Sequence, residues 1–181
     1  MIQPMAKNSA VSVSRQNEII SAAIEVFAEM GFYRATTAKV AERTNISQPY
    51  IFKFFSTKEE LLRAALKTSW TRIADSFNQV VSTVPPELLE KELITAYEKI
   101  MYEHRNEVLL QMQAQTIMDA PIVEVMREGF DSIRQIVLNA FVEAGIPEPA
   151  ERTMLFLARG MLCNISMALD MPELMKTDDN D

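Results

Sequence analysis

A short stretch near the N-terminus carries side chains suited to contacts with nucleic acid. Between Ser47 and Lys53 it combines short polar groups, a tyrosine and a lysine. A helix in the major groove of DNA needs polar groups near its start for base edges and phosphates, and a cation within reach of the backbone. Gln48 can bond adenine in bidentate fashion, whereas the Tyr50 ring can lie against a thymine methyl and its hydroxyl can reach a phosphate. If these were ordinary solvated residues instead, the whole pattern would be coincidental.

Two short helices are expected to position this stretch. Thr37 can cap the first of them, which ends near Asn45, because asparagine tolerates the left-handed backbone of a tight turn. Ser47 begins the second, with Pro49 in its first turn, where a missing backbone donor costs little. Two short helices about three residues apart predict a helix-turn-helix.

Longer helices are predicted on both sides of this unit. The one before it opens at Ser14, carries apolar residues at spacings of three and four, and stops at Gly31. The one after it starts at Lys58 and runs to about residue 81, because Thr57 and Glu60 have the spacing of a capping box.

The rest of the chain also predicts helices only. Hairpin turn signals and sustained alternation of apolar and polar residues are lacking. The predicted fold is therefore all-α, with a three-helix DNA-binding head at residues 1–60 joined by the long fourth helix to a helical bundle at 61–181. Proline and glycine breaks divide the later part of the bundle into helices at 87–103, 105–118, 121–144 and 149–169.

Charge is divided unevenly along the 181 residues. The whole chain carries −7 and has a pI near 4.9, which taken alone argues against a nucleic-acid binder. Up to Lys58, however, seven Lys or Arg stand against four Glu, a net of +3 that leaves −10 on the remainder. A mildly basic head on an acidic body can contact phosphates while the body stays off the duplex.

Other classes of site find little support in the sequence. With one cysteine, Cys163, and one histidine, His104, neither a zinc site nor a Cys-His nucleophile pair is expected, and no intramolecular disulfide can form. There is no phosphate-binding or dinucleotide-binding glycine motif. We expect no catalytic residues, no metal and no cofactor. Without a secretory signal or an apolar run of roughly 18 residues, a cytoplasmic location is expected.

The stretch GFYRATTAKVAERTNISQPYIFKFFSTKEELL resembles the DNA-binding signature of the tetracycline-repressor (TetR) family. The resemblance covers about residues 15–62. It implies a dimeric, all-helical repressor released by a small ligand, in which the residues matching Thr37 and Lys58 contact phosphates. The positions that fall on the family's pattern are Gly31, Phe32, Thr37, Ala41, Ser47, Phe55, Lys58 and Leu61.

Two departures qualify this resemblance. Asn45 stands where the family usually has glycine, which is benign, and Phe52 stands where it usually has a phosphate-binding tyrosine. The second departure removes a hydroxyl, and we expect Tyr50 to supply the contact in its place. The predicted DNA-binding residues are Thr36, Thr37, Ser47, Gln48, Pro49, Tyr50, Lys53 and Lys58.

Methionines and aromatic residues of the body are candidates for the walls of an apolar pocket. Methionine adapts its shape to varied ligands, so the group fits a bulky lipophilic effector. Such residues at helical spacing are just as often plain core. The acidic side chains of Asp75, Glu98 and Asp119 could favour a cation or lie on solvated helix faces. The predicted ligand-binding residues are Trp70, Phe77, Tyr97, Met101, Met112, Met126, Phe130 and Phe156.

The last predicted helix is apolar over more than one face, which favours a buried position or a subunit contact. Small residues in it permit close approach, and we expect a four-helix bundle made by two chains together with the helix at 121–144. The predicted dimer-interface residues are Ile133, Val137, Phe141, Ala158, Met161, Leu162 and Ile165.

The leading hypothesis is a homodimeric repressor that places two helix-turn-helix units in successive major grooves of a palindromic operator, about 34–36 Å apart. Effector binding would favour a state in which the fourth helix holds the heads at the wrong separation. The alternative is a small-molecule carrier or interaction module without specific DNA recognition, which the acidic pI and Phe52 favour. The two hypotheses differ in whether DNA binding has a specific site and a steep salt dependence.

Overall fold

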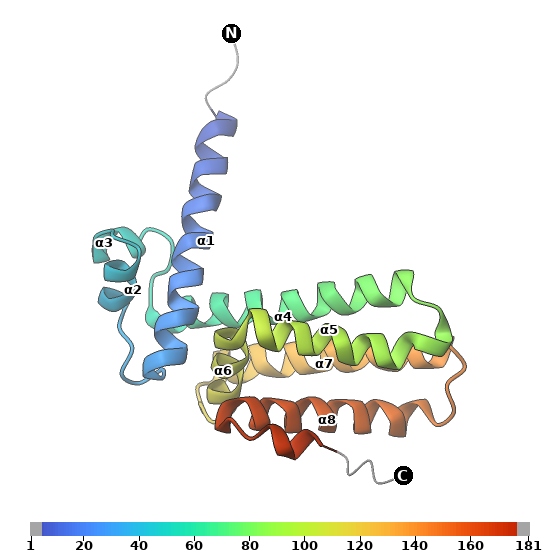
Figure 1. Cartoon of the computed structure of the whole chain (residues 1–181). Coiled ribbons are helices and arrows are strands. Elements are labelled where there is room, and N and C mark those ends of the chain that lie inside the picture. Colours follow the sequence, from blue (N-terminus) through green and yellow to red (C-terminus); the bar gives the residue numbers. More distant parts are fainter. Residues whose placement is uncertain (1–4, 177–181) are drawn as a thin grey trace.

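The computed structural model describes residues 5–176, and every regular element in this range is helical. The head comprises α1, α2 and α3, and the bundle of α4 to α8 extends away from it (Figure 1). The predicted all-α architecture, with a long α4 leading from head to bundle, is confirmed. The helices are α1 (Met5–Met30), α2 (Thr37–Arg43), α3 (Gln48–Ile51), α4 (Lys58–Thr83), α5 (Leu89–Glu103), α6 (Arg105–Ala114), α7 (Ala120–Glu143) and α8 (Pro149–Leu169), with the 3-10 turns η1 (Pro86–Leu88) and η2 (Pro172–Met175).

The helix-turn-helix is built around apolar residues of three helices. Ile19 and Phe27 of α1 are fully buried, as are Val40 of α2 and Ile51 of α3. Asn45, in the turn between α2 and α3, has a φ of 53°, so it adopts the left-handed conformation that the sequence predicts. Helix α2 packs against both α1 and α3, so it holds the three helices together as one unit.

Two predicted boundaries in the head are wrong. Helix α1 begins at Met5 rather than at Ser14, because no glycine or proline interrupts the chain between these residues. The cap of α2 is Thr36, whose hydroxyl accepts from the Lys39 amide at 3.2 Å. Thr37 is instead the first helical residue, and it is buried.

Capping sets the start of α4 where the sequence predicts it. Thr57 Oγ1 accepts from the Glu60 amide at 3.0 Å, and the Glu60 carboxylate accepts from the Ser56 amide at 2.7 Å. Beyond this cap, α4 packs against α1 at its start and against α7 over much of its length. One helix therefore belongs to both the head and the bundle.

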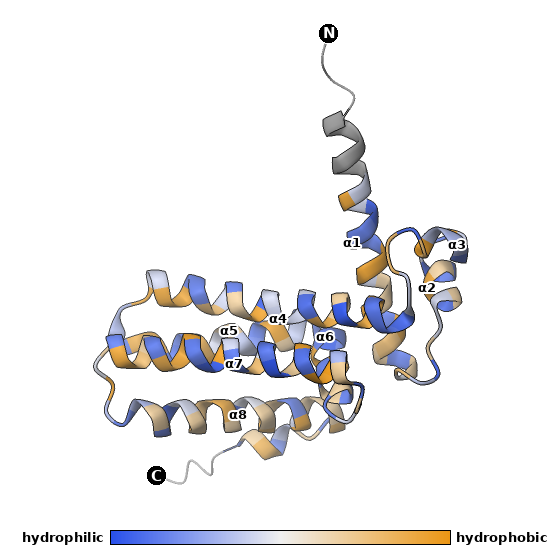
Figure 2. Ribbon diagram, turned by 180° about the vertical axis from the view of Figure 1, so that it is seen from behind, coloured by the Kyte–Doolittle hydropathy of each residue, from blue (hydrophilic) through white to orange (hydrophobic). Residues whose placement is uncertain are grey.

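Helices α4 to α7 turn most of their apolar residues toward the core, whereas α8 also carries exposed apolar residues (Figure 2). Helix α6 ends at Ala114, four residues before the predicted Met118, because the chain tightens into two turn bonds there. Asp119 then caps α7 by accepting from the Ile122 amide at 3.3 Å. No helix within the described range is long and apolar enough to cross a membrane.

Candidate DNA-binding surface and ligand pocket

Helix α3 separates a packing side from an exposed side, as the sequence predicts. Ile51 and Phe55 are buried in the head, whereas Gln48, Pro49 and Lys53 are exposed. Ser47 has an extended backbone at the helix start and makes no capping bond through its side chain. Its hydroxyl is therefore available to a ligand on the same side as Gln48.

Tyr50 and Lys53 form one cluster beside this exposed side. The Lys53 ammonium lies 5.0 Å from the centroid of the Tyr50 ring, and Phe54 packs edge-on against the same ring at 5.4 Å. A cation held near an aromatic ring is attracted to its electron-rich face. Phe52, which lies between Tyr50 and Lys53 in the sequence, has nearly half of its surface exposed and offers no polar group.

Thr37 orients Gln48 through a hydrogen bond that the sequence did not indicate. The Gln48 amide nitrogen donates to Thr37 Oγ1 at 2.8 Å, across the helix-turn-helix. Thr37 has only 7% of its surface exposed, while its neighbour Thr36 is exposed. The phosphate contact predicted for Thr37 would therefore run through its backbone N–H at the start of α2.

Lys58 holds the loop between α1 and α2 against the start of α4. Its ammonium donates to the carbonyls of Phe32 at 2.9 Å and Ala35 at 3.3 Å, and lies 4.2 Å from the centroid of the Phe32 ring. An ammonium has three N–H donors, so one remains for a further partner. A phosphate contact by Lys58 stays a prediction.

An ion cluster fastens α2 to α1. Arg43 donates to Glu29 at 2.7 and 2.8 Å and to Glu25 at 2.9 Å. The hydrogen bond from Arg43 lowers the pKa of the Glu29 carboxyl below its usual value, and the bonds to both glutamates raise the pKa of Arg43. Because both glutamates neutralise the charge of Arg43 within the head, Arg43 acts by holding α2 in place against α1. In the sequence, this ion cluster is indicated by the spacing of Glu25 and Glu29, which are four residues apart and therefore lie on one face of α1.

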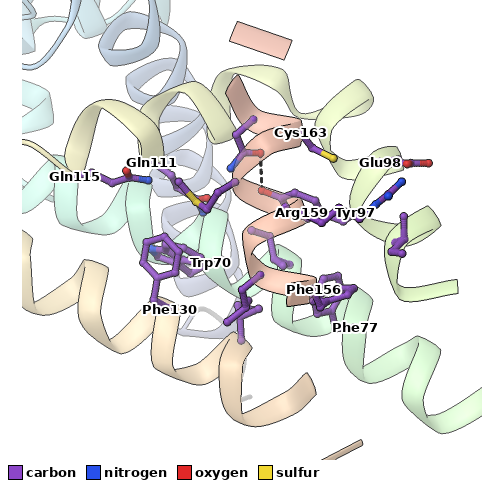
Figure 3. A pocket seen from close by; sticks show the side chains of 17 residues that line it. Trp70, Phe77, Tyr97, Glu98, Gln111, Gln115, Phe130, Phe156, Arg159 and Cys163 are labelled. Atoms are coloured by element: carbon purple, nitrogen blue, oxygen red, sulfur yellow. Dashed lines mark hydrogen bonds between the residues drawn. The ribbon is translucent and has the colours of Figure 1, made fainter. Parts of the chain in front are cut away.

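The bundle contains a narrow apolar cavity of about 50 Å³, between α4, α5, α6, α7 and α8. Its volume exceeds the roughly 10–15 Å³ that one water molecule needs. Aromatic rings pack around it in pairs: Trp70 and Phe130 at 4.8 Å, and Phe77 against Tyr97 at 6.3 Å and Phe156 at 5.7 Å (Figure 3). Five of the eight predicted ligand-binding residues thus lie around one space.

The three methionines of that prediction lie elsewhere. Met126 lines an adjoining open groove that shares Gln115, Phe130 and Leu157 with the cavity, and neither Met101 nor Met112 lines the cavity. Gln111 of α6 and Gln115 at its C-cap, one helical turn apart, face the cavity, so Met112 is rotated away from it by about 100°. The cavity wall thus does not include these methionines, and their part in ligand binding stays a prediction.

Polar side chains complete the cavity wall, and the prediction missed most of them. Besides the two α6 glutamines they include Glu98, Arg159 and Asn164. The Tyr97 hydroxyl donates to Asn164 Oδ1 at 2.8 Å, and burial raises the pKa of Tyr97 to about 12. The sequence did offer a signal for this hydrogen bond, which is the asparagine within the apolar run of α8. Buried polar groups in native proteins are normally paired, so a partner for it could be expected.

Helix α6 connects the cavity to the head. Gln111 Nε2 donates to Ser69 Oγ of α4 at 2.9 Å, and Gln113 Nε2 donates to the Ala28 carbonyl of α1 at 2.8 Å. Arg72 of α4 donates through Nε to both carboxylate oxygens of Glu107, at 2.9 and 3.1 Å. The sequence indicated α4 alone as the link, but the structure adds α6.

The predicted dimer surface divides into two groups. Ile133, Val137 and Phe141 are buried in the chain's own core, so they are not available to a second chain and this part of the prediction is wrong. The reason is that the apolar stripe of α7 packs against α4 and α8, where Phe141 lies edge-on to Phe156. On α8, Met161 is half-buried and lines the cavity. The other predicted residues of α8, which are Ala158, Leu162 and Ile165, are exposed together with Met154, Leu155 and Leu169.

Comparisons with known proteins agree with this geometry. Residues 19–65 match the family model for bacterial regulatory proteins of the tetR family. The chain is 27% identical over 143 residues to the HTH-type transcriptional repressor KstR2 of Mycobacterium tuberculosis, a match that covers 75% of this chain and 70% of that protein.

Solved structures share the fold over most of its length. The fatty acid degradation regulator FadR from Bacillus halodurans superposes with a TM-score of 0.73 at 18% identity, covering 85% of this chain and 88% of that one. FadR from Bacillus subtilis, solved in complex with stearoyl-CoA, gives a TM-score of 0.71 at 15% identity and covers 89% of each chain. The chain is a DNA-binding transcriptional regulator of the TetR family. Members of this family regulate transcription and are not enzymes.

Proposed function

We propose that this regulator is a homodimeric repressor that binds a palindromic operator and leaves it when a small lipophilic effector enters the cavity. Residues 1–60 form its DNA-binding domain, and residues 61–181 bind the effector and dimerise. The observation that carries the proposal is the connection, through α4 and α6, between an exposed polar face on α3 and an apolar cavity in the bundle.

The DNA contact is assigned to the exposed side of α3 and to its flanks. Ser47, Gln48 and Tyr50 lie where base edges and phosphates would be met, and Lys53 supplies a cation. The backbone N–H groups at the start of α2, beside Thr36 and Thr37, add a phosphate site, and Pro49 and Lys58 flank it. The net charge of +3 up to Lys58 is of the sign that DNA requires.

Dimerisation is assigned to the exposed apolar face of α8. Met154, Leu155 and Leu169 are each more than half exposed, and Leu162 and Ile165 lie between them at helical spacing. A second copy that packs on this face through a two-fold axis would bury it and give two heads for the two half-sites. Leu162→Glu is expected to shift the protein to a monomer in sedimentation, with a loss of operator affinity.

A lipophilic effector is favoured by the cavity wall. Five aromatic side chains surround the space, and structural neighbours include a regulator bound to stearoyl-CoA and the ketosteroid regulator KstR2. A ligand larger than the space present has to spread the surrounding helices. Because Gln111 and Gln113 join α6 to α4 and α1, such a movement biases the orientation of the head.

The DNA half of the proposal is tested by selecting binding sites from a randomised duplex pool. We expect a palindrome whose binding weakens steeply with salt, and Lys53→Ala should reduce the log–log salt slope by about two, one for each head of the dimer. A non-specific carrier would enrich no site. Tyr50→Phe tests whether Tyr50 replaces the hydroxyl that Phe52 lacks: that idea is wrong if Tyr50→Phe leaves operator affinity unchanged while Lys53→Ala abolishes it.

The ligand half is tested on the selected operator. Operator affinity, followed by fluorescence anisotropy, should fall as a lipophilic ligand is added, and the operator should weaken ligand binding by the same factor. Independent, simultaneous binding of both would contradict this mechanism.

A further inference from the structure

Resting on the proposed role of the cavity as effector site, we infer that the cavity selects apolar molecules carrying one uncharged oxygen group, a hydroxyl or a carbonyl. Asn164 binds that oxygen, and Tyr97 is the positioning residue that orients Asn164. The inference rests on two amide side chains in the cavity wall, each of which has one half bonded and the other half free.

Both amides are buried among apolar neighbours. Asn164 has 5% of its surface exposed and Gln111 has 4%, and both line the cavity. The Tyr97 hydroxyl donates to Asn164 Oδ1 at 2.8 Å, marked by the dashed line in Figure 3. On the opposite wall, Gln111 Nε2 donates to Ser69 Oγ at 2.9 Å.

The other half of each amide faces open space. Within the described residues, Asn164 Nδ2 and Gln111 Oε1 make no hydrogen bond. Some polar side-chain atoms of this range are fully enclosed and lack a hydrogen-bond partner, but neither of these two atoms is one of them. Each therefore keeps some accessible surface. Because both residues are at least nine-tenths buried and line the cavity, these two atoms are open to it. These two amides therefore add one free donor, Asn164 Nδ2, and one free acceptor, Gln111 Oε1, to the cavity wall.

Tyr97 fixes which half of Asn164 faces the cavity. The Tyr97 hydroxyl, which burial keeps protonated by raising its pKa to about 12, donates to Asn164 Oδ1. Because this bond takes up Oδ1, Nδ2 is the half of the amide that is left for a ligand. The orientation thus makes Asn164 a donor, and a ligand oxygen must accept from it.

The remaining polar groups favour an uncharged ligand oxygen. Gln111 Oε1 can only accept, so it attracts a hydroxyl and repels a carboxylate. Glu98 and Arg159 line the same space with opposite charges, so the repulsion of an anion by Glu98 offsets its attraction to Arg159. Placing a carboxylate among apolar side chains without a net positive charge nearby is costly.

The chain provides its own reporter for the test, because its single tryptophan, Trp70, lines the cavity. Purified protein is titrated with decane, decanol, a decanone and decanoate while Trp70 fluorescence is followed. Since one net hydrogen bond is gained, decanol and the decanone should bind about three- to tenfold more tightly than decane. Decanoate should bind no more tightly than decane.

Variants separate binding by Asn164 from a purely structural role. Asn164→Leu should lower the decanol-to-decane affinity ratio to about one while decane binding persists. Tyr97→Phe, which keeps the ring, should lower the ratio partway, because the amide can then turn. Asn78→Leu, the same change on an exposed position of α4, should keep the wild-type ratio.

The outcomes distinguish this inference from the function on which it rests. Equal affinity for decane and decanol, or a ratio that Asn164→Leu and Tyr97→Phe both leave intact, would overturn the inference alone. If no probe changes Trp70 fluorescence, the assignment of the cavity as effector site falls, and the inference falls with it.

Discussion

Gly129 is the position at which the packing between α4 and α7 can be tested most sharply. A Cβ atom added there would lie 2.3–2.4 Å from three atoms of the Trp70 ring, whereas ordinary contact begins at 3.4 Å. The ring is rigid and packs against Phe130 at 4.8 Å. Gly129→Ala therefore forces the ring or the helix to move by about 1 Å.

Two effects of opposite sign decide the outcome of Gly129→Ala. Alanine is favoured over glycine inside a helix by about 1 kcal/mol. Overpacking a filled core costs about 1–3 kcal/mol, and an overlap with a rigid ring lies in the upper part of that range. We expect the free energy of unfolding to fall by about 1–2 kcal/mol and the Trp70 emission to shift.

Gly160→Ala is the matched control, since it adds the same methyl inside α8. Its Cβ would lie 3.6 Å from the nearest atom of Tyr97, an ordinary contact, so the helix preference alone should raise stability by up to about 1 kcal/mol. Urea unfolding followed by circular dichroism, at one fixed protein concentration, measures both variants. In a Trp70→Leu background, Gly129→Ala should become neutral or stabilising. Equal effects of the two alanine substitutions in the native background would refute the argument.

Three further predictions concern the turn, the cavity and the α4–α6 link. Asn45 has a positive φ, so Asn45→Ala should lower the free energy of unfolding by about 1 kcal/mol, whereas Asn45→Gly should cost nothing; chemical denaturation checks both. The pKa of Tyr97 is raised from 10 to about 12 in the folded state, which therefore holds its proton more tightly. The stability that this group contributes is complete below pH 10 and is lost as the pH rises through 12, by up to about 3 kcal/mol. This loss should be missing when Tyr97→Phe is unfolded over the same pH range. Arg72→Met removes the arginine bonded to the buried Glu107 carboxylate, whose remaining neighbour is His104 Nδ1 at 3.8 Å, and should lower the thermal midpoint at a cost of about 1–3 kcal/mol. A Glu107→Gln, Arg72→Met double variant that is no better than the single one would contradict this.

Local signals predicted the elements of the head, though not all of their boundaries. The cap at Thr57, the left-handed Asn45 and the apolar stripe of α1 each depend on residues within a few positions of one another. Where two adjacent residues could play one role, as Thr36 and Thr37 could at the start of α2, the sequence did not decide between them. The choice depends on which threonine the packing buries.

The bundle shows what such signals leave open. Helix α7 is amphipathic whether its stripe of Ile133, Val137 and Phe141 packs on its own chain or on a second one, so the pattern could not reveal that α4 and α8 cover the stripe. The aromatic residues gather at one cavity because helices distant in sequence meet there. The hydrogen bond between Tyr97 and Asn164 spans 67 positions, which no local pattern can indicate.

The central claim, specific binding of DNA by a symmetric pair of heads, is tested most directly by a footprint of the purified protein on the DNA that flanks its own gene. The account predicts two protected half-sites related by two-fold symmetry, with centres about 34–36 Å apart. Protection should weaken with salt and with Lys53→Ala. Uniform binding along the duplex, with no protected site at any salt concentration, would contradict it.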